Sequence, residues 1–281
     1  MENWSKYGTA FASVLFLLSG LCPVFLSEQD VPAASGQVEH APLPPSGHPP
    51  IVFPERPVSW QKLLPNLARD QKDIWLFPIS RAVEHHLKPA LVLTAITAGT
   101  IAAVDVPSGK YFQRTRSFDG FNRAFSGKNT SVVMFAAPSV FYGISLLRKD
   151  SYAQHTFLLA GEAVMSSEVL TTVMKDVDRR MKPFEVPLKG DFSDTWFRSH
   201  SASVMRGIGS FPSGHTISAF SLATVFADRY PNPRWHAWVA YGLATAVGFS
   251  RVSQQSHHPS DVFAGATLGY AIAHYGVLHA R

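Results

Sequence analysis

The sequence predicts an all-α fold: a bundle of about six core helices, preceded by a signal or anchor segment and a Pro-rich linker. Long apolar segments recur from residue 88 to the end of the chain, and apolar and polar residues alternate only weakly, which argues against a sheet. Charged residues make up 16% of the 281 residues, against roughly 25% in soluble domains. The helices are therefore expected to be deeply buried or in contact with a membrane.

Residues 1–35 have the composition of a signal peptide or an N-terminal anchor. A short polar stretch with Lys6 precedes residues 9–26, which are almost wholly apolar, as in exported chains. The small-residue cleavage sites lie late in this segment, so an uncleaved anchor is the alternative. We expect export to the periplasm or the cell-envelope membrane, with the functional site on the outer side.

Composition predicts a linker and limits the kinds of partner and metal site that are expected. Residues 36–58 are rich in Pro, Ser, Gly and Ala and predict an extended linker. Cys22 is the only cysteine and lies in the apolar N-terminal stretch, so neither an intramolecular disulfide nor a thiolate metal site is expected. The net charge of +5 suits an anionic substrate or membrane surface. Nucleic acid is not an expected partner, because the chain has no Lys/Arg run and no recognition motif.

Residues 59–281 are expected to form a single domain whose core spans 88–281. Residues 59–88 predict one or two short amphipathic helices that pack on this core or lie on a membrane surface. The core helices are expected at 89–104, 131–147, 152–175, 213–228, 235–251 and 259–278. Each is near the lower limit of a bilayer span, about 17 residues.

Small residues and long connections refine this bundle. Gly265 and Gly269, and likewise Gly242 and Ala246, are four residues apart, a spacing that lets helices approach closely. Residues 105–130 carry mixed charge and predict a solvated connection. The connection over 183–209 is longer than most in a compact domain, which favours a functional loop or a lid.

The stretch 250–261 brings a guanidinium, two imidazoles and a carboxylate together between two apolar segments. Pro259 is suited to the first position of a helix. His257 then lies just before that helix and Asp261 one turn inside it, so the two side chains can meet. A carboxylate beside an imidazole fixes its tautomer, which makes His257 a candidate base or nucleophile. A polar loop with a satisfied His–Asp pair is the alternative.

A second candidate segment runs from Ser210 to His215. Ser213 is a good N-cap, Gly214 allows a sharp turn, and the free N–H groups of a helix start can bind an anion. His215 stands at the mouth of this site. The same tetrapeptide, Pro-Ser-Gly-His, ends at His48 in the linker, where no apolar helix follows, and His48 is assigned no role.

A third segment, from Lys175 to Pro183, places cations at the end of a predicted helix. The helix dipole favours cations there, so a solvated helix end is one interpretation. A cationic cradle for an anion is the other.

The three segments read Lys-x6-Lys-Pro, Pro-Ser-Gly-His and Ser-Arg-x5-His-x3-Asp, in that order. Together they resemble the motifs of the type 2 phosphatidic acid phosphatase superfamily, the fold shared with vanadium haloperoxidases. The resemblance covers about residues 88–281, with its motif core over 175–261. One position departs: Lys182 stands where the family usually has Arg, so the charge is kept but the bidentate fork is lost. Arg180 is a second candidate for that contact.

The resemblance implies a metal-independent phosphatase that hydrolyses a phosphomonoester or pyrophosphate through a phosphohistidine intermediate. His257 would be the nucleophile, Asp261 would orient its ring, and His215 would act as acid and then as base. The phosphate would be held by Lys175, Lys182, Ser213, Gly214 and Arg251. No metal or other cofactor is expected, and vanadate is expected to inhibit. The apolar helices favour a phosphorylated lipid as substrate over a small phosphomonoester.

Two other functions compete with this interpretation. A vanadate-dependent haloperoxidase would use the same cationic cage, although the spacing of the third motif is closer to the phosphatase branch. A non-enzymatic membrane protein that binds lipid would have no need for His257, His215 and Asp261 together.

Overall fold

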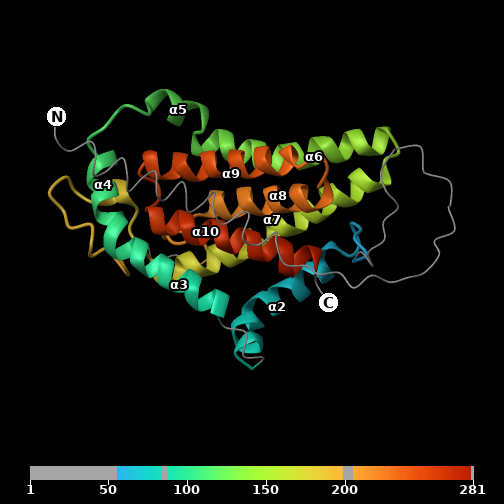
Figure 1. The fold of residues 1–281 in the computed structure, drawn as a ribbon, viewed down its shortest axis with the longest axis horizontal. Helices are drawn as coiled ribbons and strands as arrows, with labels where there is room; N and C mark the ends of the chain where they lie inside the picture. The colour runs from blue at the N-terminus through green and yellow to red at the C-terminus, as the bar shows by residue number, and fades with distance from the viewer. Residues whose placement is uncertain (1–55, 84–87, 199–204, 280–281) are drawn as a thin grey trace.

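The computed structural model describes residues 56–83, 88–198 and 205–279, and this part of the chain is helical with no strand (Figure 1). The all-α prediction is therefore confirmed. The predicted signal or anchor segment, and the linker up to residue 55, lie outside the described residues.

The helices follow one another along the chain with short connections, apart from the loop before α8. Their bounds are α2 Leu63–Val83, α3 Lys88–Thr100, η1 Ile101–Asp105, α4 Val106–Phe112, α5 Asp119–Ala124, α6 Gly127–Leu147, α7 Ser151–Asp178, η2 Pro183–Glu185, α8 Gly214–Arg229, α9 Trp235–Ser253, α10 Pro259–Ala271 and η3 Ile272–Leu278. Here η1 and η3 are π-helical turns and η2 is a 3-10 turn. Each predicted core helix is present, and α10 begins at Pro259 as expected.

The solvated connection predicted over 105–130 begins later than expected, so the predicted start at residue 105 is wrong. The first core helix does not end near residue 104, because η1 and α4 continue it to Phe112. Pro107 lies in the first turn of α4, directly after the π-helical turn η1. Asp105 is 1% exposed, since it has buried charged and polar partners that are described below.

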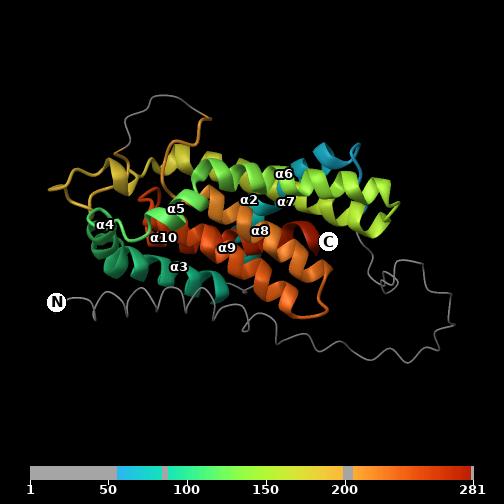
Figure 2. The ribbon, with the colours of Figure 1, turned by 90° about the horizontal axis from the view of Figure 1, so that it is seen from above.

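Helix α8 lies at the centre of the bundle, against α7, α9 and α10, with α6 alongside α7 (Figures 1 and 2). Close approach of α10 to α8 depends on glycine, as predicted. A Cβ added at Gly269 would lie 2.3 Å from the Ile217 carbonyl oxygen, and one at Gly265 would lie 2.9 Å from that of Ser213. The same prediction is wrong for Gly242, where an added Cβ would meet nothing within 4 Å.

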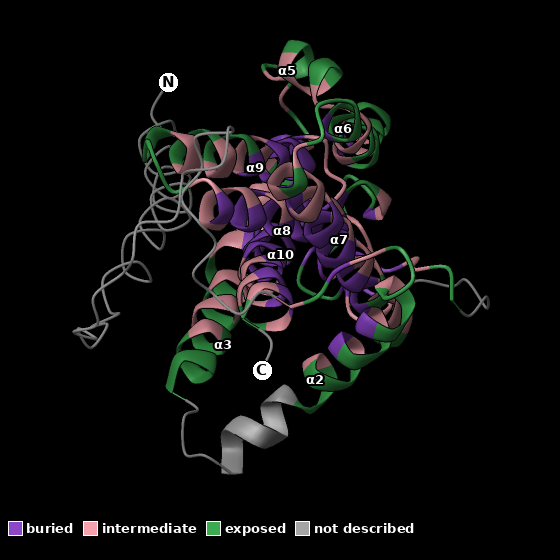
Figure 3. Cartoon of the chain, turned by 90° about the vertical axis from the view of Figure 1, so that its right-hand side faces the viewer, coloured by how far each residue is buried: buried purple, intermediate pink, exposed green. Residues whose placement is uncertain are grey.

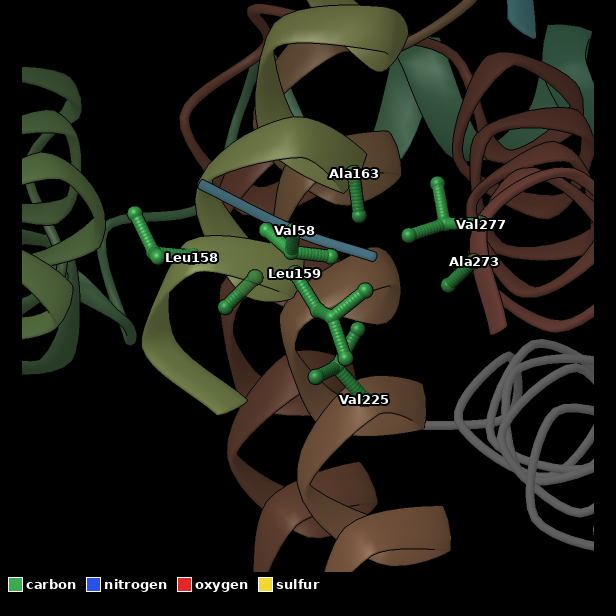
Figure 4. Packing of buried hydrophobic residues seen from close by; sticks show 8 residues of the cluster. Val58, Leu158, Leu159, Ala163, Val225, Ala273 and Val277 are labelled. Carbon is green, nitrogen blue, oxygen red and sulfur yellow. The ribbon is translucent and has the colours of Figure 1, made fainter. Parts of the chain in front are cut away.

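One apolar cluster links the first half of α7 to the last turns of α8 and to η3. Leu159 and Ala163 of α7, Val225 of α8 and Val277 of η3 are buried against one another (Figure 4). Val58, from the end of the predicted linker, is buried in the same cluster. The chain before α2 is thereby fixed to the bundle.

The outer helices present apolar side chains away from this core. Among its described residues α3 has none that is buried, and α6 exposes Val133 at 62% and Phe135 at 52% (Figure 3). Exposed apolar surface of this kind is typical of membrane or partner contact. Among the described residues, three helical segments are long and apolar enough to cross a membrane: Lys88–Phe112, Gly127–Leu147 and Ser151–Glu185.

Candidate active site

The three predicted motif segments meet at one end of the bundle, where α7 ends and α8 and α10 begin. The Ser210 N–H donates to the Arg180 carbonyl over 2.8 Å, which joins the second segment to the first. The Ser213 N–H donates to the Asp261 carbonyl over 3.0 Å, which joins the second to the third. Residues far apart in sequence are therefore held together by the backbone itself.

His257 is 5% exposed, and its ring is oriented by one short contact. Its Nδ1 lies 2.6 Å from the Ser210 carbonyl oxygen and 3.6 Å from Asp261 Oδ2. A carbonyl can only accept, so Nδ1 carries the proton and Nε2 keeps a free lone pair. Burial lowers the pKa of His257 to about 4, against the opposing effect of Asp261. The imidazole is therefore neutral at pH 7.

Asp261 is fully buried and has a partner on each oxygen. Its Oδ2 accepts from the Ser210 hydroxyl over 2.5 Å and from the His258 N–H over 2.8 Å. Its Oδ1 accepts from Arg180 Nη1 over 2.5 Å. Burial raises the pKa of Asp261, but the charge of Arg180 and the interactions with His257 and His258 together outweigh burial and hold that pKa well below its usual range. The carboxylate stays ionised beside His257.

Arg180 is 1% exposed. Its guanidinium donates to buried carboxylates instead of pointing toward the place where a phosphate would bind. Besides Asp261, its Nη2 donates to Asp105 Oδ2 over 2.6 Å and its Nη1 to the Ser260 hydroxyl over 2.8 Å. Asp105 Oδ1 in turn accepts from the Ser260 N–H over 3.0 Å. The guanidinium is thus a buried bridge between two carboxylates, and this geometry does not support the phosphate contact considered for it.

Asp105 was missed by the sequence analysis, which assigned it to a solvated connection. The available signal was its position directly after a predicted helix of uncharged residues, at 89–104. A single carboxylate there either ends the helix in solvent or is buried with a cation. Sequence alone does not choose between these, because Arg180 is far away in the chain.

His215 lies in the first turn of α8, and its Nε2 faces the start of α6. Nε2 is 2.9 Å from the Ser131 hydroxyl and 3.1 Å from the Gly127 carbonyl oxygen. Burial and then the charge of Arg251 lower the pKa of His215 to about 4. Ser131 and Gly127 were not predicted, since nothing in the α6 sequence marks them as neighbours of a histidine.

Arg251 is 2% exposed at the end of α9. Its Nε donates to the Ser250 hydroxyl over 3.0 Å, and its Nη2 donates to the Phe125 carbonyl. A Cβ added at Gly127 would lie 3.0 Å from Arg251 Nη1 and 3.7 Å from His215 Nε2. Glycine at this position therefore lets α6 begin directly against the cation and the imidazole.

Lys175 lies beside the start of α8. A Cβ added at Gly214 would be 3.6 Å from Lys175 Nζ and 3.1 Å from Thr171 Cγ2, so glycine leaves room for the lysine head group. The charge of Lys175 contributes to the lowered pKa of both His257 and His215. The lysine, both histidines and the Gly214 backbone therefore share one small region.

Ser213 and Lys182, also predicted to bind phosphate, have other partners in the structure. Ser213 is the N-cap residue of α8, as expected, but makes no side-chain capping bond. Its Oγ accepts from the Thr216 hydroxyl over 2.8 Å. Lys182 Nζ lies 5.8 Å from the centre of the Phe184 ring and within electrostatic range of Lys175.

His258 is fully buried next to the candidate nucleophile. Its Nε2 lies 3.2 Å from the Met181 carbonyl oxygen. This contact supports the structural role expected for it.

Comparison with known proteins identifies the segment that carries this site. Residues 156–279 match the model of the PAP2 superfamily. This part of the chain is a PAP2 segment. It includes all eight residues named from the three motifs: Lys175, Lys182, Ser213, Gly214, His215, Arg251, His257 and Asp261. The resemblance inferred from the motifs is confirmed, and Asp105 and Ser131 lie before the PAP2 segment.

Several relatives carry the names of lipid phosphatases. The chain is 38% identical over 68 residues to "Lipid A 1-phosphatase" of Porphyromonas gingivalis, covering 24% of this chain and 15% of that protein. It is 35% identical over 106 residues to "Lipid A 1-phosphatase" of Rhizobium etli, covering 38% and 42%. The chain thus spans less than half the length of these two relatives.

One solved structure matches a longer stretch of the chain. It is a transmembrane PAP2-type phosphatidylglycerolphosphate phosphatase from Bacillus subtilis, 20% identical, with a TM-score of 0.35. The match covers 73% of this chain and 92% of that one.

Proposed function

We propose that the chain is a metal-independent phosphatase that hydrolyses a phosphomonoester or pyrophosphate of a lipid through a phosphohistidine intermediate. The observation that carries the proposal is the arrangement at His257. The Ser210 carbonyl accepts a hydrogen bond from Nδ1, and Nε2 keeps its lone pair. The positive charge of Lys175 lies within electrostatic range of the ring. The names of the relatives support a phosphate ester as the substrate class.

In the proposed first step, His257 Nε2 attacks phosphorus in line. The P–N bond forms as the bond to the leaving oxygen breaks, and positive charge develops on the imidazole. Asp261, ionised and 3.6 Å from Nδ1, stabilises that charge. Because His257 is neutral above a pH of about 4, no proton has to be removed before the attack.

In the same step, His215 protonates the leaving oxygen, and in the second step it takes a proton from the water that releases phosphate. Its low pKa is caused by burial and by Arg251. A bound phosphate dianion neutralises the neighbouring cations and raises that pKa, which favours protonation when substrate arrives. Ser131 and the Gly127 carbonyl hold the ring in place.

Positioning and charge neutralisation dominate phosphoryl transfer, so the cations matter as much as the nucleophile. We assign the phosphate oxygens to Lys175, Arg251 and the Gly214 N–H, with Ser213 and Lys182 at the edge of the site. Lys182 then supplies charge without the bidentate geometry of arginine.

Arg180 and Asp105 are not assigned a contact with the phosphate. They act as positioning residues for Asp261. Arg180 bonds Asp261 Oδ1, while Asp105 bonds Arg180 and the Ser260 N–H at the start of α10. The side chain of Asp261 is thereby fixed relative to the helix that carries it. Lys182 stands where the family usually has an arginine that binds phosphate. Lys175 and Arg251 must then supply the bonds to phosphate that Lys182 does not make.

We further propose that the enzyme lies in a cell-envelope membrane with its active site on the outer side. The apolar exposed faces of α3 and α6 and the three candidate spans support membrane residence. A lipid substrate then reaches the site from the surrounding bilayer.

The function is tested by phosphate release from a panel of substrates by the purified chain. The panel contains phosphatidate, an isoprenyl pyrophosphate, phosphatidylglycerophosphate, lipid A and p-nitrophenyl phosphate. We expect turnover of at least one lipid phosphate well above that of p-nitrophenyl phosphate. Release from the soluble ester alone would contradict the lipid assignment, and release from none would favour a lipid-binding protein. Bromination of a dye with vanadate and peroxide would instead identify a haloperoxidase.

Vanadate and a chelator separate the proposed chemistry from metal-assisted hydrolysis. Vanadate mimics pentavalent phosphorus, so it should inhibit at low concentration by binding His257 and the cations. EDTA should leave initial rates unchanged. Activity that EDTA removes and zinc or magnesium restores would contradict metal independence.

A further inference from the structure

A second cluster of polar side chains lies at the opposite end of α8 from the candidate active site. His215 is in the first turn of α8 and Asp228 is in its last turn. The two residues are 13 positions apart, which corresponds to about 20 Å along the helix. Asp228 faces η3, which contains His274 and is directly followed by His279, and one ligand atom from each of the three side chains lies within 4.8 Å of the others.

The π-helical turn η3 is what brings the two histidines together. Residues five apart point in different directions on an α-helix, which turns about 100° per residue. In η3 the His279 N–H donates to the His274 carbonyl over 3.0 Å, the spacing of a π-helical bond, and the two rings lie 4.3 Å apart. Single π-helical turns occur frequently at functional sites.

The hydrogen bonds leave suitable atoms for a cation. His279 Nδ1 is 2.9 Å from the His274 carbonyl oxygen, so Nδ1 carries a proton and Nε2 is the atom that can bind a metal. A ligating histidine commonly donates its other N–H to a backbone carbonyl in this way. The Tyr270 ring is stacked on that of His274 at 5.2 Å and 13°, which fixes its orientation.

The distances also fit. His274 Nδ1 and Asp228 Oδ2 are 3.0 Å apart. Two ligands at about 2.0–2.2 Å from one tetrahedral zinc ion are separated by about 3.3–3.5 Å. His279 is exposed at the end of the described chain, so its ring can move the small distance that completes the set.

We propose that Asp228, His274 and His279 bind a divalent transition-metal ion of the zinc class. Two imidazoles and a carboxylate are ligands that zinc and its neighbours prefer, and water would occupy the remaining position. The ion ties η3 to the end of α8 and plays no part in phosphoryl transfer. The alternative is a simple ion pair between Asp228 and His274.

The test is zinc titration by calorimetry on the full chain, purified without a histidine tag and stripped with EDTA. We expect one zinc ion per chain and a rise in melting temperature on zinc addition. His279→Gln should weaken zinc binding at least about tenfold, since removing a ligand costs no less than disturbing its surroundings. His236→Gln, a half-buried histidine at the start of α9, is the control and should bind as the unaltered chain does.

The choice of His279 separates the metal site from the ion pair, because His279 is not part of that pair. Absence of zinc binding in the unaltered chain would overturn the proposal. Binding that His279→Gln retains in full, or that His236→Gln loses to the same extent, would also overturn it. Phosphatase activity is measured alongside and should be the same in His279→Gln, so failure here leaves the proposed function untouched.

Discussion

At the residue scale, the buried bridge between Asp105, Arg180 and Asp261 is the feature on which the active-site geometry depends most. Asp105→Asn removes one of the two charges that Arg180 faces, while the side chain keeps its shape. Breaking a buried pair typically costs about 3–5 kcal/mol. We expect a loss of about 3 kcal/mol in unfolding free energy and a lower kcat with an unchanged KM.

A matched control is Asp194→Asn, which removes an exposed ion pair with Arg198, where both side chains are more than half exposed. Such pairs are worth less than about 1 kcal/mol. Chemical unfolding and steady-state kinetics of both variants are the measurements. Equal effects of the two substitutions would show that the buried bridge has no special role.

The two buried histidines make stability depend on pH. The pKa of His257 falls from its ordinary value of 6.5 to about 4 on folding, and so does that of His215. Between these values the unfolded chain binds more protons than the folded one, so stability falls as pH is lowered from about 6.5 to about 4. Each histidine contributes up to about 3 kcal/mol to this loss, at about 1.4 kcal/mol per pKa unit.

The difference between the unaltered chain and His257→Gln isolates one of these contributions, because the titrating carboxylates are common to both. The variant should lose less stability over the same pH range in thermal unfolding. A variant whose stability falls as steeply as that of the unaltered chain would contradict the low pKa of His257.

Much of the candidate site follows from sequence because its residues lie in short motifs beside the starts and ends of helices. Pro259 begins α10 and places Asp261 one turn inside, as local rules predict. Asp105 and Ser131 could not be predicted from sequence. Asp105 contacts Arg180, and Ser131 contacts His215, only because tertiary packing brings them together. The Ser210 carbonyl was missed for another reason: a backbone atom has no signature in the sequence.

At the element scale, the contact between α10 and α8 depends on glycine. Gly269→Ala would place a Cβ 2.3 Å from the Ile217 carbonyl oxygen, so the two helices must move apart. Overpacking of this kind costs about 1–3 kcal/mol, and we expect a loss of that size in thermal or chemical unfolding.

Gly242→Ala in α9 is the matched control, because an added Cβ there meets nothing within 4 Å. Alanine has a higher helix propensity than glycine by about 1 kcal/mol, so this variant should be neutral or slightly more stable. Equal destabilisation by both substitutions would argue against a close α8–α10 contact.

The helices themselves were predictable, but their ends were less so. Apolar periodicity predicts α6 to α10, yet the extension of the first core helix to Phe112 depends on the burial of Asp105. The switch from α10 to the π-helical η3 has no clear sequence signal. A helix whose apolar run stops at a charged residue can therefore continue where that charge has a buried partner.

At the scale of the whole molecule, the proposed orientation places the active-site end outside the cell. Lys189, in the loop after η2, and Asn232, between α8 and α9, are exposed at opposite ends of the bundle. In a Cys22→Ser background, Lys189→Cys should react with a membrane-impermeant thiol reagent on intact cells with a permeable outer envelope. Asn232→Cys should react only after lysis, and the reverse pattern would contradict the orientation.

The central claim is that phosphate passes through His257. The most direct test is acid-free quenching of the enzyme during turnover of a substrate labelled in its phosphate, followed by detection of label on the protein. We expect a covalent phosphate that is stable in alkali and lost in acid, and that is absent from His257→Ala. His48→Ala, in the linker copy of the tetrapeptide, should behave as the unaltered chain. Labelling of His257→Ala, or its turnover at a rate near that of the unaltered chain, would contradict the account.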